Sequence, residues 1–469
     1  MAVIPSDANI LYDDQKIHKL LLACQKKSYQ IVSFSQEIET IDPLVVFRKI
    51  AQPNELHFYW ENRHQQEAFF GYGTTKYLNI AGEDRFRLSQ EFINNCLKQT
   101  IRIGDLHLPG AGPRLFCSFT FFPNIPSNSP FAPATIFLPR LMVVKNQDKC
   151  ILTINQNISQ PVNIRLIIAE IRQQIQAITI TNGKGVKPRE NSHYPPKNHK
   201  ITSYNFTSAV TSALASINAQ KFSKIVLATP RDVIAPQPFK IVESLNNLRQ
   251  NYPDCYIFSI SNGQGYNFIG ASPERLIKIQ NQQLVTDALA GSAPRGKNPE
   301  EDYKFAQELL NNEKEIREHQ AVSEFITQKL TQLGLKTQAR NNLKLLKLSN
   351  IQHLWTPIYA DIPPNVQPLD LVAQLHPTPA VAGVPTEIAC QQIRHYETFD
   401  RSLYAAPIGW LDHQGNGEFI VGIRSALIKE NHARLYAGAG IVAGSDPNKE
   451  LAEIQLKFQA LLQALMNNE

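Results

Sequence analysis

The sequence predicts a globular protein that mixes helices and strands in one to three domains. The chain has 469 residues, of which 43% are hydrophobic and 19% are charged. This composition excludes wholesale disorder, collagen and coiled coil, and it allows a sizeable buried core. Short alternating segments, typical of strands, occur along much of the chain, together with stretches whose apolar residues recur at helical spacing. The length suggests three domains of ordinary size, but large mixed enzymes exceed that size.

The N-terminal part, residues 1–200, is predicted to be mostly strands, followed by a helix at 164–178. Alternation predicts the strands at 44–48, 57–60, 68–72, 114–122, 135–144 and 149–154. Residues 181–200 hold three prolines, two glycines and five Lys/Arg with almost nothing apolar. We expect this segment to be a linker or a long exposed loop that precedes a second region, residues 201–469.

In the second region, predicted strands and helices follow one another more closely along the chain. Strands are predicted at 224–228, 255–261, 266–271, 275–279 and 284–290, helices at 299–311 and 313–333, and a hairpin from 419–428 and 433–441. The closing helix has the clearest signals, because Asp446 can cap it and Pro447 suits its first position. Its apolar residues recur at helical spacing: Leu451, Ile454, Phe458, Leu461 and Leu465.

Charge and cysteine use narrow the class of protein. The net charge of +6 is spread over the chain without a block of like charges, so we expect no nucleic-acid partner, and only the basic segment 181–200 keeps that alternative open. Apolar runs are too short for a transmembrane helix, and the chain start lacks the pattern of a secretory signal. The six cysteines lie far apart without a CxxC motif. They suit buried thiols in a reducing compartment, so we expect the cytoplasm.

Two predicted helices carry glutamates beside their apolar faces. Glu450 and Glu453 border the apolar stripe of the closing helix, and Glu315 and Glu318 lie near that of the longest predicted helix. Carboxylates on two helices could converge on a hard cation, for which oxygen ligands favour magnesium. The alternative is a solvated helix edge, with Glu453 paired to Lys457 one turn later.

Lys224 and Glu274 could form an acid/base pair. Lys224 begins the predicted strand KIVLA, and Glu274 lies in ASPERL, a predicted turn between two strands. If both side chains face a pocket, burial and neighbouring charges would shift both pKa values toward neutrality, giving an amine base and a carboxylic acid. A solvent-exposed strand end and a surface turn are the ordinary alternatives.

Other motifs indicate ligand contacts without identifying the ligand. LAGSAPRG at 289–296 and GAGIVAG at 438–444 predict tight, donor-rich loops that an anion could approach. The second has the wrong spacing for a dinucleotide turn, and no GxxxxGK[ST] motif is present. Arg424 is predicted inside an apolar strand, where it needs a carboxylate partner from the protein or from a ligand. His353 is by default a core histidine.

Several sequence segments, each a weak signal by itself, together indicate a particular protein family. In order along residues 224–454 they are KIVLA, GASPERL with LAGSAPRG, EIREH, IQHLWTPI, LHPTPAVAGVP, YAAPIGW, FIVGIRSALI and AGAGIVAGSDPNKELAEI. This array resembles the chorismate-utilising enzymes, which include isochorismate, salicylate, anthranilate and aminodeoxychorismate synthases. The N-terminal half looks like the more variable part of the same fold. The resemblance implies an α+β fold of two large packed antiparallel sheets with helices outside, chorismate as substrate and Mg²⁺ as cofactor.

The resemblance also implies roles for individual residues. Lys224 would activate water for attack at C2 of chorismate, and Glu274 would protonate the departing C4 hydroxyl. Glu318 and Glu453 would bind magnesium, with Glu450 assisting through water. Substrate contacts are implied for a further set: Gly291, Ser292, His353, Ala380, Tyr404, Arg424, Gly438, Gly440 and Lys457.

Details of the motifs favour one activity within this family, that of an isochorismate synthase. Relatives that use ammonia usually lack the lysine at 224, and salicylate synthases tend to carry threonine at 380, where this chain has alanine. The resemblance thus implies an isomerase of the menaquinone or phylloquinone type, monomeric and without a glutamine amidotransferase subunit. A salicylate synthase and a catalytically silent, ligand-binding relative remain alternatives. Thr229 stands where many relatives have arginine, which leaves open how the Lys224 pKa would be lowered.

Overall fold

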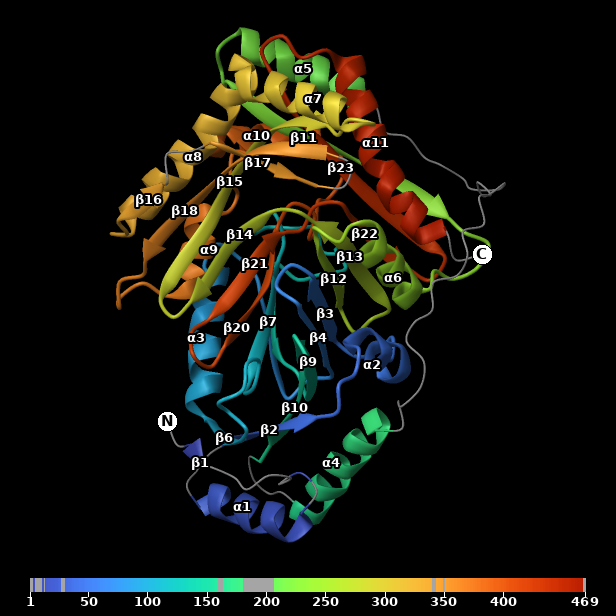
Figure 1. Ribbon diagram of the computed structural model, residues 1–469, viewed down its shortest axis with the longest axis vertical. Helices are drawn as coiled ribbons and strands as arrows, with labels where there is room; N and C mark the ends of the chain where they lie inside the picture. Colours follow the sequence, from blue (N-terminus) through green and yellow to red (C-terminus); the bar gives the residue numbers. More distant parts are fainter. Residues whose placement is uncertain are drawn as a thin grey trace.

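Two large sheets packed face to face form the centre of the molecule, with helices around them (Figure 1). The computed structural model describes residues 3–4, 11, 13–26, 30–158, 163–179, 206–339, 343–348 and 351–466. The expected linker at 181–200 lies outside the described residues. Within them, the two mainly antiparallel sheets and the outer helices confirm the α+β fold that the resemblance implied.

The first sheet has 13 strands among the described residues. Its order is β1 (Val3–Ile4), β6 (Thr100–Gly104), β2 (Ile31–Ile38), β10 (Lys149–Asn157), β9 (Leu141–Asn146), β4 (Glu67–Tyr72), β3 (His57–Asn62), β12 (Tyr256–Ser261), β13 (Tyr266–Ser272), β22 (Ser425–Lys429), β23 (His432–Val442), β11 (Lys224–Ile234) and β19 (Gly383–Val384). Among the strands of the described residues, only β6 pairs in parallel, with β1 and β2. Because β3 pairs with β12, strands from both halves of the chain share this sheet.

The second sheet has 10 strands within the described ranges. Its order is β16 (Thr337–Ala339), β18 (Ile351–Asp361), β15 (Gln283–Pro294), β14 (Arg275–Gln280), β21 (Gly417–Val421), β20 (Pro407–Asp412), β7 (Arg114–Phe119), β8 (Ala134–Leu138) and β5 (Lys76–Ile80), and β17 (Lys344–Lys347) also pairs with β18. Here β20 pairs with β7, so this sheet also joins the two halves of the chain.

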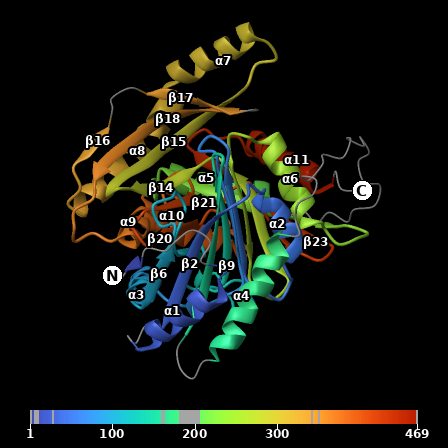
Figure 2. The ribbon, with the colours of Figure 1, turned by 60° about the horizontal axis from the view of Figure 1, so that its bottom comes forward.

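Helices cover the ends and outer faces of the sheets. They are α1 (Asp14–Lys26), α2 (Pro43–Ile50), α3 (Arg85–Lys98), α4 (Ile164–Thr179), α5 (Phe206–Asn218), α6 (Ile241–Asn251), α7 (Pro299–Asn311), α8 (Glu313–Gln332), α9 (Pro368–Leu375), α10 (Thr386–Tyr396) and α11 (Pro447–Met466). Helices α5 and α11 pack on β23, α10 packs on β11, and α8 packs on β15. Helices α1 and α4 lie side by side at the opposite end of the molecule (Figures 1 and 2).

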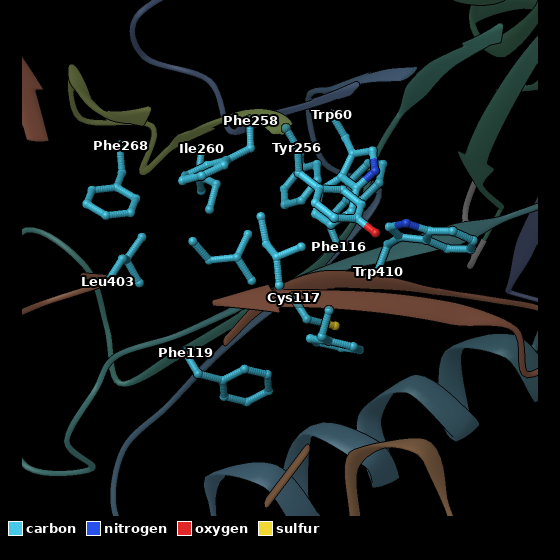
Figure 3. Packing of buried hydrophobic residues seen from close by; sticks show 14 of the residues in the cluster. Trp60, Phe116, Cys117, Phe119, Tyr256, Phe258, Ile260, Phe268, Leu403 and Trp410 are labelled. Atoms are coloured by element: carbon cyan, nitrogen blue, oxygen red, sulfur yellow. The ribbon is translucent and has the colours of Figure 1, made fainter. Parts of the chain in front are cut away.

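An aromatic layer holds the two sheets together. The rings of Phe58 on β3 and Phe116 on β7 stack with centroids 4.5 Å apart, and Trp410 on β20 meets Phe69 on β4 edge-on at 5.9 Å. Figure 3 shows Phe116, Trp410 and their neighbours packed between the sheets. Burial of such large side chains is the main favourable term in folding. It fixes the sheets relative to one another and so supports the site at one end of them.

Three predicted strands were assigned incorrectly. Residues 44–48 form part of helix α2, because Asp42 caps its start by accepting from the Leu44 N–H and Pro43 occupies the first turn. The expected strand at 135–144 is two strands, β8 and β9, separated at residues 139–140. The expected hairpin strand at 419–428 contains the end of β21 and the start of β22, which belong to different sheets. The hairpin itself is β22–β23.

Candidate active site

Lys224 lies inside the protein, at the start of β11. It is 4% exposed, and its Nζ donates a hydrogen bond to Oε1 of Glu318 on α8 at 2.5 Å. Gly440 of β23 lies beside this ion pair, because a Cβ placed there would be 3.3 Å from Lys224 Cε and 3.6 Å from Glu318 Oε1. The alternative of a solvent-exposed strand end is therefore wrong. Lys224, Glu318 and Gly440 therefore lie together where β11, α8 and β23 meet.

Glu274 lies between β13 and β14, where its N–H donates to Ser272 Oγ at 3.2 Å. The residue is 8% exposed, so the surface-turn alternative is wrong. Burial raises the pKa of Glu274 to about 7, and the negative charge of Asp287 adds to this effect. The positive charges of Lys224 and Arg424 act in the opposite direction. Glu274 thus shares an electrostatic environment with Lys224 and holds a proton near neutral pH, as a general acid must.

Glu315 on α8 and Glu450 on α11 have pKa values that burial and neighbouring carboxylates raise. Burial raises the pKa of Glu315, and the charges of Glu318 and Glu453 raise it further. Burial also raises the pKa of Glu450, with a further contribution from Glu453. Because the charge of Glu453 on α11 acts on Glu315 of α8, these two carboxylates lie within electrostatic range of each other. The side chain of Glu453 is 47% exposed and pairs with Lys457, as the solvated-edge alternative predicted, so the metal site stays a prediction.

Lys457 connects α11 to β23. Its Nζ lies 2.7 Å from Glu453 Oε1, the expected pair one turn apart, and it donates to the Gly438 carbonyl at 2.8 Å. On the side of Gly438 where a side chain would project, a Cβ would lie 2.9 Å from the Tyr404 hydroxyl. Tyr404 is buried and stacks on Tyr436 with ring centroids 5.3 Å apart. Gly438 therefore lies between Lys457 and Tyr404.

The backbone of β23 offers hydrogen-bond donors at this place. In the β11–β23 ladder, Val226 lies opposite Gly440, and Ala228 lies opposite Gly438. The N–H groups of these two β11 residues point away from β23. That of Val226 donates to the Ala382 carbonyl at 2.8 Å, and that of Ala228 donates to Glu397 Oε1 at 2.7 Å. In an antiparallel ladder such facing residues form non-hydrogen-bonded pairs, so Gly438 and Gly440 also direct their amides away from β11. Strand β22 pairs with β23 only up to Tyr436. Within the described residues no strand covers these two amides, and they can donate to an anion.

The sequence predicted loops at 289–296 and 438–444. This prediction is wrong for Gly291, which lies in β15, and for Gly438 and Gly440, which lie in β23. Gly291 occupies a bulge of β15 and has φ +74°, a conformation that glycine adopts readily. After the bulge, Ser292 Oγ lies 2.9 Å from His353 Nδ1. Burial lowers the pKa of His353 to about 3, and the charges of Arg424 and Lys457 lower it further, so the ring is neutral.

Arg424 is not inside a strand. It lies at the crossing from β21 in one sheet to β22 in the other, with φ +49°. Its guanidinium contacts the Cys255 thiol at 3.7 Å, and no carboxylate of the described residues forms an ion pair with it. Within the described ranges, the alternative of an internal ion pair is not found. Since its charge acts on the pKa of both Glu274 and His353, the guanidinium lies within electrostatic range of both groups, and a ligand carboxylate could pair with it.

Ala380 is the predicted residue with the weakest connection to the others. It is half-buried in the segment between α9 and β19, and β19 pairs with Lys224. Its side chain packs against the hydrophobic core. Glu315, which the sequence placed beside Glu318 but to which the resemblance gave no role, contacts another predicted residue, because its Oε2 accepts from the Ser292 N–H at 3.3 Å. Its position one turn before Glu318 could have indicated that it lies near these residues.

Comparison with known proteins identifies the class of protein. The model of a family described as chorismate binding enzyme matches residues 15–466. The isochorismate synthase MenF of Bacillus subtilis is 32% identical over 458 residues, which cover 96% of each chain. The salicylate biosynthesis isochorismate synthase of Pseudomonas aeruginosa is 32% identical, over 93% of this chain and 90% of that protein.

A solved structure agrees with these matches. That of MenF, the menaquinone-specific isochorismate synthase from Escherichia coli, superposes with a TM-score of 0.78 and 25% sequence identity, covering 97% of this chain and all of the other. The chain belongs to the chorismate-binding enzyme family, as its motifs indicated. In the part of the chain that the structure describes, no helix is both long and apolar enough to cross a membrane.

Proposed function

We propose that the chain is an isochorismate synthase, an isomerase that adds water at C2 of chorismate and releases the C4 hydroxyl as water. The observation that carries this proposal is the shared environment of Lys224 and Glu274, a buried amine and a buried carboxyl with a raised pKa. The reaction removes a proton on one side of the ring and delivers a proton on the other, which a single group cannot do. Near full-length similarity to proteins named isochorismate synthases supports the same conclusion.

The remaining residues suit a substrate with two carboxylates. Arg424 and Lys457 supply positive charge, and the amides of Gly438 and Gly440 supply donors on the same side of β23. We propose that these groups bind the carboxylates of chorismate, with Tyr404 beside them. The further pocket walls in this proposal are Gly291, Ser292, His353 and Ala380. Fixed donors and cations orient an anion before the reaction begins, which lowers the entropic part of the barrier.

We further propose Mg²⁺ as cofactor, bound by Glu318 and Glu453, with Glu450 assisting through water. Within the described residues, no group of three or more His, Cys, Asp and Glu is placed to hold a metal ion. A magnesium site does not require three, because this ion keeps several waters and takes ligands from an anionic substrate. The all-oxygen donor set on α8 and α11 fits these requirements. When bound, the ion would neutralise the ring carboxylate, which the glutamates alone would repel.

Glu318→Ala should weaken magnesium binding. We expect the dissociation constant for Mg²⁺, measured by calorimetry with chorismate present, to rise by about 10- to 100-fold. Glu324, an exposed glutamate on the same helix, provides the matched control, and Glu324→Ala should leave the titration unchanged. An unaltered titration for Glu318→Ala would remove Glu318 from the ligand set.

Gly438→Ala should be more damaging than Gly440→Ala. At 438 a Cβ would lie 2.9 Å from the Tyr404 hydroxyl and 3.2 Å from the Leu227 carbonyl, whereas at 440 the nearest atom is the flexible Lys224 Cε at 3.3 Å. We expect chorismate affinity to fall about tenfold, ~1.4 kcal/mol, for Gly438→Ala and clearly less for Gly440→Ala. Equilibrium titration measures both, and the opposite order would contradict the placement of Gly438.

Product analysis tests the proposed function directly. Purified full-length protein is incubated with chorismate and Mg²⁺, and the products are separated by chromatography. We expect isochorismate alone, because Lys224 favours water as nucleophile and Ala380 is typical of relatives that stop before pyruvate is lost. Salicylate together with pyruvate would instead support a salicylate synthase. Absence of turnover, with chorismate still bound, would support a silent ligand-binding relative.

We also propose a cellular setting for this activity. The isochorismate would feed menaquinone or phylloquinone synthesis, which the similarity to a menaquinone-specific relative supports. The protein would act in the cytoplasm as a monomer. A glutamine amidotransferase subunit would be unnecessary, because water and not ammonia is the nucleophile. Incubation with chorismate and ammonium salts should therefore yield no anthranilate.

A further inference from the structure

Arg401 is a fully buried cation behind the site. It is 1% exposed, and its Nε and Nη2 donate to the two carboxylate oxygens of Glu397 at 2.8 and 2.6 Å. Two of its other N–H groups donate to backbone carbonyls, Nη1 to Val381 at 3.0 Å and Nη2 to Val226 at 2.8 Å. The planar guanidinium thus binds a carboxylate and two strand or loop carbonyls at once, which a lysine ammonium cannot do with the same geometry.

Glu397 binds the same strand. Its Oε1 accepts a hydrogen bond from the Ala228 N–H at 2.7 Å. The short strand β19 pairs only with Lys224 and Ile225. Beyond that point the ion pair takes the place of a neighbouring strand, since the Val226 carbonyl and the Ala228 amide bind Arg401 and Glu397. The edge of β11 next to Lys224 is therefore held by the backbone of β19 and of Ala382, and from the Val226 carbonyl onward by these two side chains.

Arg401 also holds the other walls of the site. The Val381 carbonyl that it binds belongs to the residue after Ala380, and its own carbonyl accepts from the Tyr404 N–H at 2.8 Å. One residue therefore connects the strand of the base, the Ala380 segment and the turn that carries Tyr404. The contacts of Arg424, Glu453 and Lys457 do not involve this pair.

We propose that Glu397 and Arg401 are positioning residues, an ion pair that holds Lys224 at a fixed distance from the Ala380 and Tyr404 walls. This inference rests on the proposed function, in which Lys224 is the base. A shift of about 1 Å in a reacting group can lower a rate 100-fold. Loss of the pair should therefore slow the chemical step and leave substrate binding by the groups on β23 and α11 nearly unchanged.

Arg401→Lys tests the proposal, and Glu397→Gln serves as a second variant in case the first does not fold. We expect kcat for chorismate to fall by about 10- to 100-fold with KM within about threefold. In a Lys224→Ala background the same substitution should have little further effect, because its influence passes through Lys224. An equal loss in that background, or an unchanged kcat, would overturn the proposal.

Arg249→Lys is the matched control. Arg249 also forms a forked ion pair, with Asp42 at 2.8 and 3.2 Å, and its side chain is 13% exposed, but it joins α6 to α2 away from the site. This control should lower the melting temperature yet leave kcat within about twofold. A fall in kcat equal to that of Arg401→Lys would show that the loss follows general destabilisation, which would also overturn the proposal.

Hydrogen exchange separates this inference from the proposed function. In Arg401→Lys, peptides covering 224–234 and 376–384 should exchange faster than in the wild type, and those covering 256–272 should not. Unchanged exchange at 224–234 would overturn the positioning role, whatever the activity. If the wild type failed to convert chorismate while exchange changed as expected, the proposed function would fail and the support of β11 by the ion pair would stand.

Discussion

Lys224→Ala should reduce turnover of chorismate by about 10²- to 10⁴-fold, the usual contribution of a general base. The amine is buried on β11, and no other lysine among the described residues has its Nζ against Glu318. Water at C2 would lose the group that accepts its proton. Because the nearby cations Arg424 and Lys457 remain, binding of chorismate should change much less than kcat. Steady-state kinetics together with calorimetric binding measure the two quantities separately.

Two further variants make this prediction specific. Lys221 is exposed and lies just before β11, so Lys221→Ala should leave turnover within about twofold of the wild type. Lys224→Arg keeps the positive charge next to Glu318 but offers no neutral amine, and it should be as inactive as the alanine variant. Turnover near the wild-type rate in either Lys224 variant would refute the assignment of the base.

Glu274→Gln should also cost about 10²- to 10⁴-fold in kcat, with little change in the affinity for chorismate. The amide has nearly the volume of the carboxyl group but cannot deliver a proton to the departing C4 hydroxyl. Glu274→Asp keeps the proton on a shorter side chain and should retain part of the activity. A large loss of binding in Glu274→Gln, without a separate loss in kcat, would instead indicate a structural role.

The pH dependence provides an independent check on Glu274. Burial raises its pKa from 4.5 to about 7, and the acid acts only when protonated. In the wild type, kcat/KM should therefore fall as pH rises through about 7. Bound chorismate adds negative charge and should move the fall in kcat to higher pH. Glu274→Asp should keep a descending limb, and Glu274→Gln should lose the limb that belongs to this group.

The same pKa shift affects stability. The folded state holds the Glu274 proton more tightly than the unfolded state, so the stability from this group is fully present below about 4.5 and is lost as pH rises through about 7. Glu274→Gln has no proton to lose at this position. Its free energy of unfolding should therefore fall less than that of the wild type between these two values, as measured by denaturant titration across the pH range.

Local sequence signals predicted several helices and strands closely. Helix α7 has the predicted bounds, 299–311, because Asn298 caps it and Pro299 fills its first position. The prediction failed at 44–48, where two valines suggested a strand although Asp42 and Pro43 begin a helix. It also failed at Arg424, since an apolar run does not reveal that the chain passes from one sheet to the other within it.

The sequence by itself determined which chemical groups the protein carries. The order of its motifs along the chain indicated the family to which the protein belongs. The motifs along 224–454 were enough to predict a lysine base, a glutamic acid that donates a proton, a magnesium site made of glutamates, and glycine amides that donate to an anion. Only the tertiary structure decided which groups meet. Lys224 contacts Glu318 across 94 residues, and Arg401 reaches Val226 across 175. Such contacts depend on the pairing of β11 with β19 and β23 and on the packing of α8, which no local window of sequence contains.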